Sequence, residues 1–304
     1  MTKTPAVSVI LPTYNRSAVL GRSVQSVLSQ SFTDFELILV DDASQDETES
    51  VVKAFDDSRI RYVKTEKNFG GAEARNIGMR LAQASLIAFQ DSDDEWRPEK
   101  LSTCITILNN ERNCIGVFSG FWQICDRKSR YMPTSDPPND RNSMFSALLR
   151  NNFVDTPTVV VRRNALDAVG GFDPAMPRYQ DWDLAIRLSS IGQMVFIKEP
   201  LILSYITPSS ISLDIYAHRD ALERIFRKNA EKILLDDKLH AVWLSRLGDA
   251  QIRTGKINLG RRNLFSALRY RPLYSRHVVK AFFSAPGSAH VYKILCKLFE
   301  QSRF

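Results

Sequence analysis

The sequence predicts an α/β fold, a mostly parallel sheet flanked by helices, followed by an all-α C-terminal region. Through the first ninety residues, short apolar runs alternate with segments of helical periodicity. From about residue 215 onward every segment has helical periodicity and the strand pattern stops. The charge changes at the same place: acidic residues slightly outnumber basic ones before it, and basic residues outnumber acidic ones by more than two to one after it. We therefore expect two domains, residues 1–212 and 213–304.

Strands and helices alternate strictly in the N-terminal part. The expected strands are Val7–Leu11, Phe35–Val40, Ile60–Lys64 and Leu86–Gln90, and the expected helices are 18–29, 46–55 and 71–84. Asp46, with Glu49 three residues later, is the expected N-cap of the second helix. This β-α-β order requires right-handed crossovers, which make the strands parallel and place helices on both faces of the sheet.

The middle of the chain is less regular, and its end is helical. The expected elements are a helix at 99–110, a strand at 115–119, a polar loop with three prolines at 126–142, a strand at 159–161, helices at 164–169 and 182–191, and one or two strands within 194–205. Further on, Trp243, Gly248 and Pro272 fall roughly where a tetratricopeptide-like helical pair has them. One pair is too short for a solenoid, so we expect an accessory helical region.

Composition excludes several classes of protein. The chain of 304 residues is 44% hydrophobic and 25% charged, which excludes global disorder. No run of about 18 apolar residues predicts a membrane-spanning helix, and the N-terminus lacks the pattern of a signal peptide. The four cysteines form no C-x-x-C pair, which favours buried free thiols in a reducing compartment. We therefore expect a cytoplasmic protein.

Three polar clusters follow the ends of predicted strands. They are Pro12–Arg16, Asp41–Ser44 and Asp91–Asp94. Because ligands bind at the carboxyl ends of the strands in an open parallel sheet, we expect the three clusters to converge at one edge. Asp42 there could accept hydrogen bonds from a nucleobase or a ribose hydroxyl.

The third cluster is the most informative, because four of the five residues from Asp91 to Glu95 are acidic. Carboxylates packed so closely repel one another unless a cation neutralises them. Mg²⁺ is often held by one or two carboxylates, with substrate phosphates and water completing its shell. Asp91 and Asp93 therefore suggest a metal that holds a diphosphate. The alternative is an ordinary solvated acidic loop.

Two further segments carry candidate chemistry. Gly70 and Gly71 open a helix with Arg75 one turn in, which suits an anion, although neither the dinucleotide-binding glycine pattern nor the P-loop pattern is matched. Later, Asp181 and Asp183 lie at or near the start of a helix. One of them could be a general base, and either could simply cap that helix.

Taken together, these motifs resemble glycosyltransferase family 2, the inverting enzymes with the nucleotide-sugar-binding GT-A fold. The segments that carry the resemblance occur in order within residues 5–205: VSVILPTYNR, ELILVDDASQDET, KNFGGAEARNIGM, LIAFQDSDDEW, VGGFDP and QDWDLAIRL. The Q-x-x-R-W motif of processive synthases is absent from the sequence. The resemblance thus implies an enzyme that adds one sugar at a time.

The resemblance also implies residue roles. Pro12, Thr13, Tyr14 and Asp42 would bind the donor nucleotide, and Arg75 would approach its phosphates. Asp91 and Asp93 would form the D-x-D motif, with Asp93 the direct ligand of Mg²⁺ or Mn²⁺. Asp181 matches the family's catalytic base. The family commonly has Glu before this base, whereas here position 180 is Gln.

The function implied is transfer from a nucleotide-diphosphate sugar to the hydroxyl of a glycan or lipid-linked acceptor, in polysaccharide, lipopolysaccharide or other surface-glycan assembly. Two alternatives stay open. One is a degenerate domain that binds a nucleotide sugar or carbohydrate, or acts as a scaffold. The other is a nucleotidyltransferase on a similar sheet.

The basic C-terminal segment 256–283 interleaves Lys and Arg with Leu and aromatic residues. An ordinary solvated helix face explains this composition. A peripheral contact with an anionic membrane surface on the cytoplasmic side is the second interpretation. We expect no nucleic-acid partner, because no recognised binding module is present.

Overall fold

The computed structural model describes residues 4–126, 128–206 and 214–270. The chain forms two compact units. The first comprises Met1–Ala175 and Gln180–Thr207, and the second comprises Met176–Tyr179 and Pro208–Phe304. Within the described residues, no helix is long and apolar enough to cross a bilayer.

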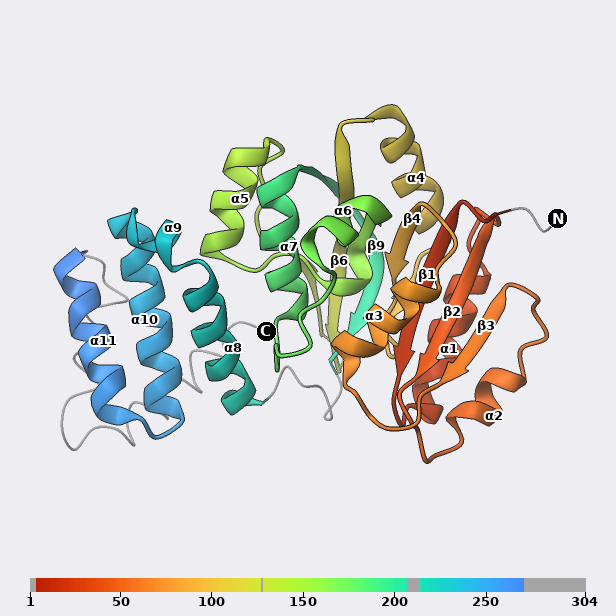
Figure 1. Cartoon of the computed structure of the whole chain (residues 1–304), viewed down its shortest axis with the longest axis horizontal. Coiled ribbons are helices and arrows are strands. Elements are labelled where there is room, and N and C mark those ends of the chain that lie inside the picture. Colours follow the sequence, from red (N-terminus) through yellow and green to blue (C-terminus); the bar gives the residue numbers. More distant parts are fainter. Residues whose placement is uncertain (1–3, 127, 207–213, 271–304) are drawn as a thin grey trace. The chain divides into compact units, whose positions relative to one another are not determined.

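The first unit is built on one mixed sheet of nine strands (Figure 1). The strands are β1 (Val7–Thr13), β2 (Phe35–Asp41), β3 (Ile60–Lys64), β4 (Leu86–Phe89), β5 (Glu95–Trp96), β6 (Cys114–Cys125), β7 (Lys128–Met132), β8 (Val159–Arg162) and β9 (Gln193–Tyr205). Their order is β3-β2-β1-β4-β8-β6-β9-β5, with β7 paired to β6. The β3-β2-β1-β4 part is parallel, as the sequence predicts, and β8 joins it antiparallel to β4.

Helices cover both faces of this sheet. They are α1 (Ser17–Leu28), α2 (Thr48–Lys53), α3 (Gly71–Leu81), α4 (Lys100–Asn110), α5 (Arg141–Arg150), α6 (Arg163–Val169) and α7 (Gln180–Ile191). Alternate residues of β1 point to opposite faces. Val9 and Leu11 share a core with the apolar sides of α1 and α4. Ile10 points to the other face, against α3, where a Cβ at Gly78 would lie 2.4 Å from its Cγ2. Only glycine permits this close approach.

The predicted loop over 126–142 is wrong at both ends. Residues Lys128–Met132 form β7, an edge strand paired antiparallel with β6, and Tyr131 packs edge-on against Trp122 at 5.8 Å between ring centroids. Edge strands are often charged, which is why this segment resembles a loop. Helix α5 begins at Arg141, where the carboxylate of Asp140 accepts a hydrogen bond of 2.9 Å from the Ser143 N–H.

The predicted cap at Asp46 also needs correction. Helix α2 begins at Thr48, and Glu47 occupies the N-cap position without a side-chain cap bond. The Asp46 carboxylate accepts hydrogen bonds from the backbone N–H of Thr48 (3.1 Å) and of Ser17 (3.0 Å), so it links the starts of two helices. A residue distant in sequence supplies one of these donors, and local patterns do not reveal it.

Every element described in the second unit is a helix: α8 (Ile215–Lys228), α9 (Ala230–Leu234), α10 (Asp237–Arg253) and α11 (Ile257–Tyr270). Helices α10 and α11 pack closely, since a Cβ at Gly248 would lie 2.7 Å from the carbonyl oxygen of Gly260. Trp243 is fully buried in this unit, whereas Phe265 is half exposed. The expected helical pair is present, and Pro272 lies outside the described residues.

Candidate active site

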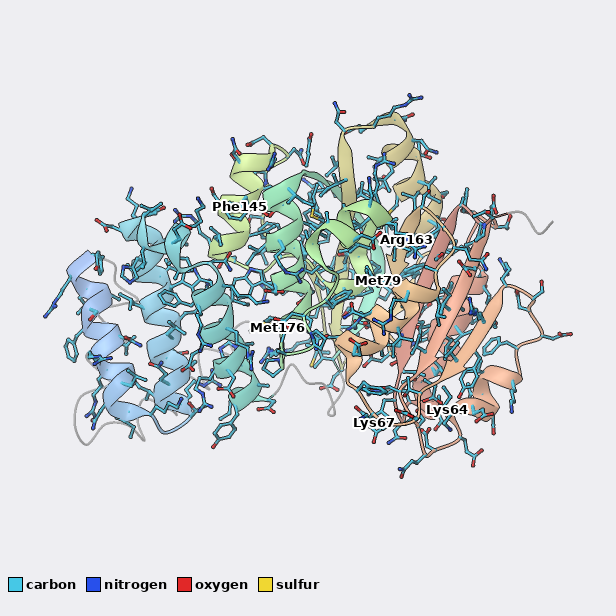
Figure 2. All side chains as sticks on the ribbon, in the orientation of Figure 1. Lys64, Lys67, Met79, Phe145, Arg163 and Met176 are labelled. Carbon is cyan, nitrogen blue, oxygen red and sulfur yellow. The ribbon has the colours of Figure 1, made fainter. Side chains whose placement is uncertain are left out.

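The three polar clusters meet at one edge of the sheet. Thr13 is the register partner of Asp41, and the Asp42 N–H donates to the Thr13 carbonyl at 2.8 Å. The acidic loop that follows β4 reaches the same place, because the Arg16 guanidinium lies 3.7 Å from the Asp93 carboxylate. Lys64 and Lys67, at and just beyond the end of β3, lie at this edge too (Figure 2). The expected convergence is confirmed.

The ends of β1 and β2 offer an aromatic and polar surface. The rings of Tyr14 and Phe69 are 43% and 40% exposed. The Thr13 hydroxyl is buried and has no hydrogen-bond partner among the described residues, while Pro12 is a buried residue of β1 paired with Val40. A buried hydroxyl without a partner is costly, which makes Thr13 a candidate for contact with a ligand.

Asp42 has a different environment from the one the sequence suggests. It is only 2% exposed. Its carboxylate accepts hydrogen bonds from the backbone N–H of Phe69 (2.9 Å) and of Gly70 (2.7 Å). Asp42 therefore fixes the loop that leads into α3 and presents the Phe69 ring to solvent.

Arg75 connects the acidic loop to the start of α7. One guanidinium nitrogen, Nη2, lies 2.5 Å from the Asp91 carboxylate. The other, Nη1, donates to Oε1 of Gln180 at 3.1 Å. The site thus brings together Asp91, Arg75 and the residue next to Asp181.

Asp93 is the second acid of the D-x-D motif, and its side chain is 17% exposed. Burial and the neighbouring Asp91 raise the pKa of Asp93. Among the described residues, no group of three or more His, Cys, Asp or Glu side chains could hold a metal ion by itself. Two carboxylates fit a Mg²⁺ or Mn²⁺ ion whose remaining ligands come from phosphate and water, and such a cation would relieve the repulsion between them.

Asp181 and Asp183 have distinct environments. Asp181 is half-buried at the start of α7, where one carboxylate oxygen accepts from the Trp182 N–H (2.7 Å) and the other from the Asn152 amide (3.4 Å). Burial raises the pKa of Asp181 to about 6. Asp183 is 2% exposed and paired with Arg187 at 2.7 Å. Asp183 is therefore tied into the structure, and Asp181 is the more accessible of the two carboxylates.

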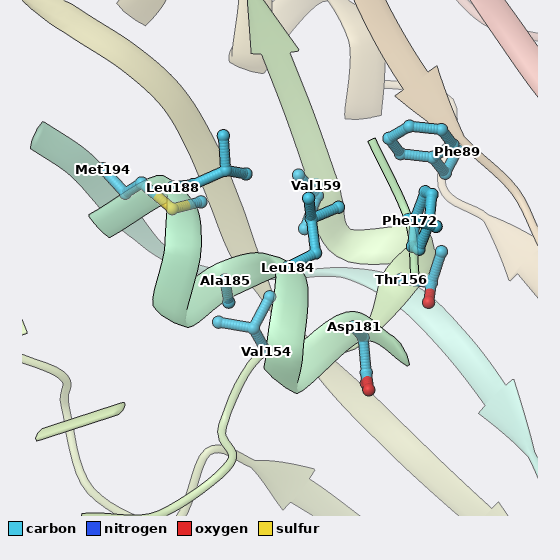
Figure 3. A pocket seen from close by; sticks show the side chains of 10 residues that line it. All are labelled: Phe89, Val154, Thr156, Val159, Phe172, Asp181, Leu184, Ala185, Leu188 and Met194. Carbon is cyan, nitrogen blue, oxygen red and sulfur yellow. The ribbon is translucent and has the colours of Figure 1, made fainter. Parts of the chain in front are cut away.

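A small apolar pocket lies beside Asp181 (Figure 3). Its lining consists of Phe89, Val154, Thr156, Val159, Phe172, Asp181, Leu184, Ala185, Leu188 and Met194. The pocket has room for about one water molecule. This apolar surrounding disfavours the charged form of Asp181, which explains the raised pKa.

Sequence reasoning missed one acid of this site, Asp155, and gave no separate role to Asp94 of the third cluster. Asp155 precedes a short 3₁₀ turn (Thr156–Thr158), where its carboxylate accepts from the Thr156 N–H at 3.0 Å. Burial, Asp181 and Asp91 raise the pKa of Asp155 to about 8. Asp94 is buried and accepts from the Tyr205 N–H at 2.9 Å. A carboxylate before a turn resembles a cap in sequence, so nothing local marks Asp155 as part of the site.

The fold and this edge of the sheet define a class of protein. Parallel strands whose carboxyl ends gather exposed aromatic rings, an arginine and acidic loops are typical of α/β enzymes that bind a nucleotide and its phosphates. The family described as Glycosyl transferase family 2 matches residues 8–170. The chain belongs to this family.

Solved structures agree on the fold. The structure of TarS residues 1–349 from S. aureus in complex with UDP-GlcNAc superposes with a TM-score of 0.66 at 17% identity, and the match covers 97% of this chain and 92% of that chain. The mannosyltransferase PcManGT from Pyrobaculum calidifontis, in complex with GDP-Man and Mn²⁺, gives a TM-score of 0.60 at 18% identity over 96% of this chain and 88% of that chain. The expected GT-A fold with a helical C-terminal region is confirmed.

Among curated relatives, the chain is 35% identical over 161 residues to UDP-Glc:alpha-D-GlcNAc-diphosphoundecaprenol beta-1,3-glucosyltransferase WfgD of Escherichia coli. That match covers 53% of this chain and 62% of WfgD. The first four curated relatives are all named as glycosyltransferases or glucosyltransferases. This chain matches them over 34–62% of their own length. Because this chain spans only part of these relatives, their substrates support proposals about this chain and do not establish its own substrates.

Proposed function

We propose that the chain transfers a single sugar, with inversion, from a nucleotide-diphosphate sugar to a hydroxyl of a glycan or lipid-linked acceptor in surface-glycan assembly. The observation that carries this proposal is the position of Arg75, which contacts both Asp91 of the D-x-D motif and Gln180, the neighbour of Asp181. Membership of the family supports the reaction class. The lipid-diphosphate acceptor in the name of WfgD supports the acceptor class.

The donor would bind along the edge formed by β1, β2 and the acidic loop. Tyr14 offers an exposed ring for a nucleobase, and the Thr13 hydroxyl offers a polar group that lacks a protein partner. Pro12 would shape this surface, and Asp42 would act by holding the backbone at Phe69 and Gly70. Arg75 would donate to the diphosphate, because a planar guanidinium suits paired phosphate oxygens.

The leaving nucleoside diphosphate develops negative charge as the sugar–phosphate bond breaks. Asp93, with Asp91, would hold a divalent cation, which supplies positive charge to the diphosphate when bound. Arg75 would add its own charge at the same place. Preorganised positive groups aimed at developing charge are among the largest contributions to catalysis.

Asp181 would act as the base. The acceptor hydroxyl forms the new bond to the anomeric carbon, its proton passes to the Asp181 carboxylate, and the nucleoside diphosphate leaves with the bonding electrons. A pKa of about 6 leaves this carboxylate mostly ionised at neutral pH, close to the optimum for a general base. The apolar pocket beside it keeps water away from one side.

The substitution Asp181→Asn tests this proposal. Transfer should fall by about 10²–10⁴-fold, the usual contribution of a general base, while calorimetry should show donor binding unchanged. Asp167→Asn, an exposed acid on α6, is the matched control. Full transfer by Asp181→Asn would exclude Asp181 as the base. NMR of the first product should show an inverted anomeric configuration, and release of pyrophosphate instead of nucleoside diphosphate would indicate a nucleotidyltransferase.

A peripheral membrane contact through the basic segment 256–283 belongs to the same proposal. The described part of this segment lies mainly in α11, which carries Arg261, Arg262 and Arg269, and residues 271–283 lie outside the described residues. Lipid-linked acceptors would favour such a contact at a cytoplasmic membrane face. Co-sedimentation of the full chain with anionic vesicles, and not with neutral ones, would support it; equal recovery with both would argue against it.

A further inference from the structure

Two neighbouring side chains of α1 hold the backbone of the loop that carries the D-x-D motif. The hydroxyl of Ser23, a buried residue, donates to the Asp91 carbonyl at 2.7 Å. Nη2 of Arg22 donates to the Asp93 carbonyl at 2.6 Å. The first pair is 68 positions apart in the chain and the second 71. Adjacent residues of one helix therefore fix the backbone at both acids of the motif.

The Arg22 guanidinium is itself supported by the end of β9. Its central carbon lies 3.7 Å from the centroid of the Tyr205 ring, which is the geometry of a cation–π contact. Tyr205 is tied to the same acidic loop, because its N–H donates to the Asp94 carboxylate at 2.9 Å and its hydroxyl to the Glu95 carboxylate at 3.2 Å. The loop is thus fastened to α1 on one side and to the last residue of β9 on the other.

The bonds from α1 end on carbonyl oxygens, so they set where Asp91 and Asp93 stand without occupying their carboxylates. A hard cation such as Mg²⁺ demands ligands close to ideal geometry, and a loop that moves would present its two carboxylates at a variable separation. Groups that orient metal ligands from behind typically change metal affinity by about 10–100-fold when they are removed. The contacts from α1 are of this kind.

We infer that Arg22 and Ser23 are positioning residues for the cation and the donor diphosphate. By holding the carbonyls of Asp91 and Asp93, they fix the separation of the two carboxylates before either ligand binds. This inference rests on the proposed function and adds two residues of α1 to the site. Groups that are already ordered in the folded protein bind a ligand more tightly, because binding no longer has to order them.

Calorimetry with UDP and with GDP, each in Mn²⁺ and in chelator, measures how strongly the cation tightens nucleotide binding. For the nucleotide that the natural chain binds more tightly, Ser23→Ala should weaken binding about tenfold or more in Mn²⁺ and leave it unchanged in chelator. Ser189→Ala is the matched control, because the hydroxyl of Ser189, also a buried residue, likewise donates to a backbone carbonyl, that of Ile186, at 2.9 Å. This control should bind as the natural chain does under both conditions.

Arg22→Met separates position from charge. It removes a positive charge that repels Mn²⁺, so charge alone predicts tighter binding in Mn²⁺, whereas loss of the bond to Asp93 predicts weaker binding. We expect binding about tenfold weaker in Mn²⁺ and unchanged in chelator. Arg59→Met is the matched control, since Arg59 also lies over a ring, that of Phe35 at 4.4 Å, and donates to a carbonyl, that of Leu28 at 3.1 Å. Because Arg22 is exposed, its variant serves if Ser23→Ala does not fold.

The outcomes distinguish this inference from the proposed function. Binding in Mn²⁺ that is as tight as in the natural chain or tighter, or that weakens by the same factor in chelator, would overturn the positioning role of the residue concerned and leave the proposed function standing. Equal binding by the natural chain in Mn²⁺ and in chelator would overturn the role of both residues. If the natural chain binds neither nucleotide under either condition, the proposed function itself fails, and the inference falls with it.

Discussion

Trp96 donates its indole N–H to the backbone carbonyl of Pro157 at 3.1 Å, although the two residues lie 61 positions apart. The ammonium group of Lys100, fully buried, donates to the next carbonyl, that of Thr158, at 2.7 Å. These two bonds join the segment after the D-x-D motif to the turn that carries Asp155. Two of the acidic loops of the site are therefore held by one set of buried contacts.

Trp96→Phe should lower the free energy of unfolding by about 1–3 kcal/mol, because it removes the donor and leaves the buried Pro157 carbonyl without it. Urea denaturation measures this change. Trp122→Phe, at a half-buried indole on β6, is the control for loss of indole area. Equal stability of Trp96→Phe and the natural chain would show that the bond contributes little.

The pH dependence of transfer should follow Asp181. Because the base must be ionised, and burial raises its pKa to about 6, the rate should fall as pH falls through this value. Transfer at pH 5 should be about tenfold slower than at pH 8, whereas an ordinary aspartate would lose little there. Initial rates at saturating substrate check this. A constant rate down to pH 4.5 would contradict it.

The substitution Asn152→Ala tests the direction in which the pH profile of transfer shifts. The Asn152 amide donates to Asp181 and lowers its pKa. Removing this donor should move the acid limb to higher pH, with donor binding unchanged. A limb that stays in place or moves to lower pH would show that another group controls the profile.

Asp155→Asn should stabilise the folded chain at neutral and higher pH. The folded-state pKa of Asp155 is raised to about 8, well above that of the unfolded chain. The folded state therefore binds the extra proton between about pH 4 and pH 8, and stability falls as pH rises through this window. The Tm advantage of Asp155→Asn, measured in chelator, should be smallest near pH 4 and grow toward pH 8.

Asp140→Asn is a control for which the effect on stability should change with pH in the opposite direction. The pKa of Asp140 is lowered by its hydrogen bonds to Ser143 at the start of α5. Its contribution to stability is present above the unfolded pKa and lost as pH falls through the lower folded pKa. A Tm difference for Asp155→Asn that does not change with pH would mean that Asp155 is ionised throughout.

Removal of metal should abolish transfer. A chelator should reduce the rate to background, and Mg²⁺ or Mn²⁺ should restore it, because without a cation the carboxylates of Asp91 and Asp93 add negative charge beside the donor diphosphate. Asp93→Asn should have the same effect without a chelator, with Asp167→Asn as the control. Unchanged transfer in chelator would remove the metal from the mechanism and leave Arg75 as the main source of positive charge.

The sequence by itself determined the parallel half of the sheet and the place of the site. The four apolar runs from Val7 to Gln90 are strands within a few residues of their expected ends, because each is apolar, short and followed by a turn or helix signal. Since ligands bind at the carboxyl ends of such strands, Tyr14, Asp42, Asp91 and Asp93 could be assigned to one edge without coordinates.

Only the tertiary structure decided the environment of each acid. The family resemblance singles out Asp181, but residue type and spacing alone do not separate it from Asp183; the physical difference comes from Arg187, which pairs with Asp183, and from the apolar pocket beside Asp181. Asp42 and Asp155 likewise depend on partners far along the chain. The bond between Arg75 and Gln180 spans 105 positions. Burial and charge act through space, so local patterns locate candidate groups and long-range packing assigns their roles.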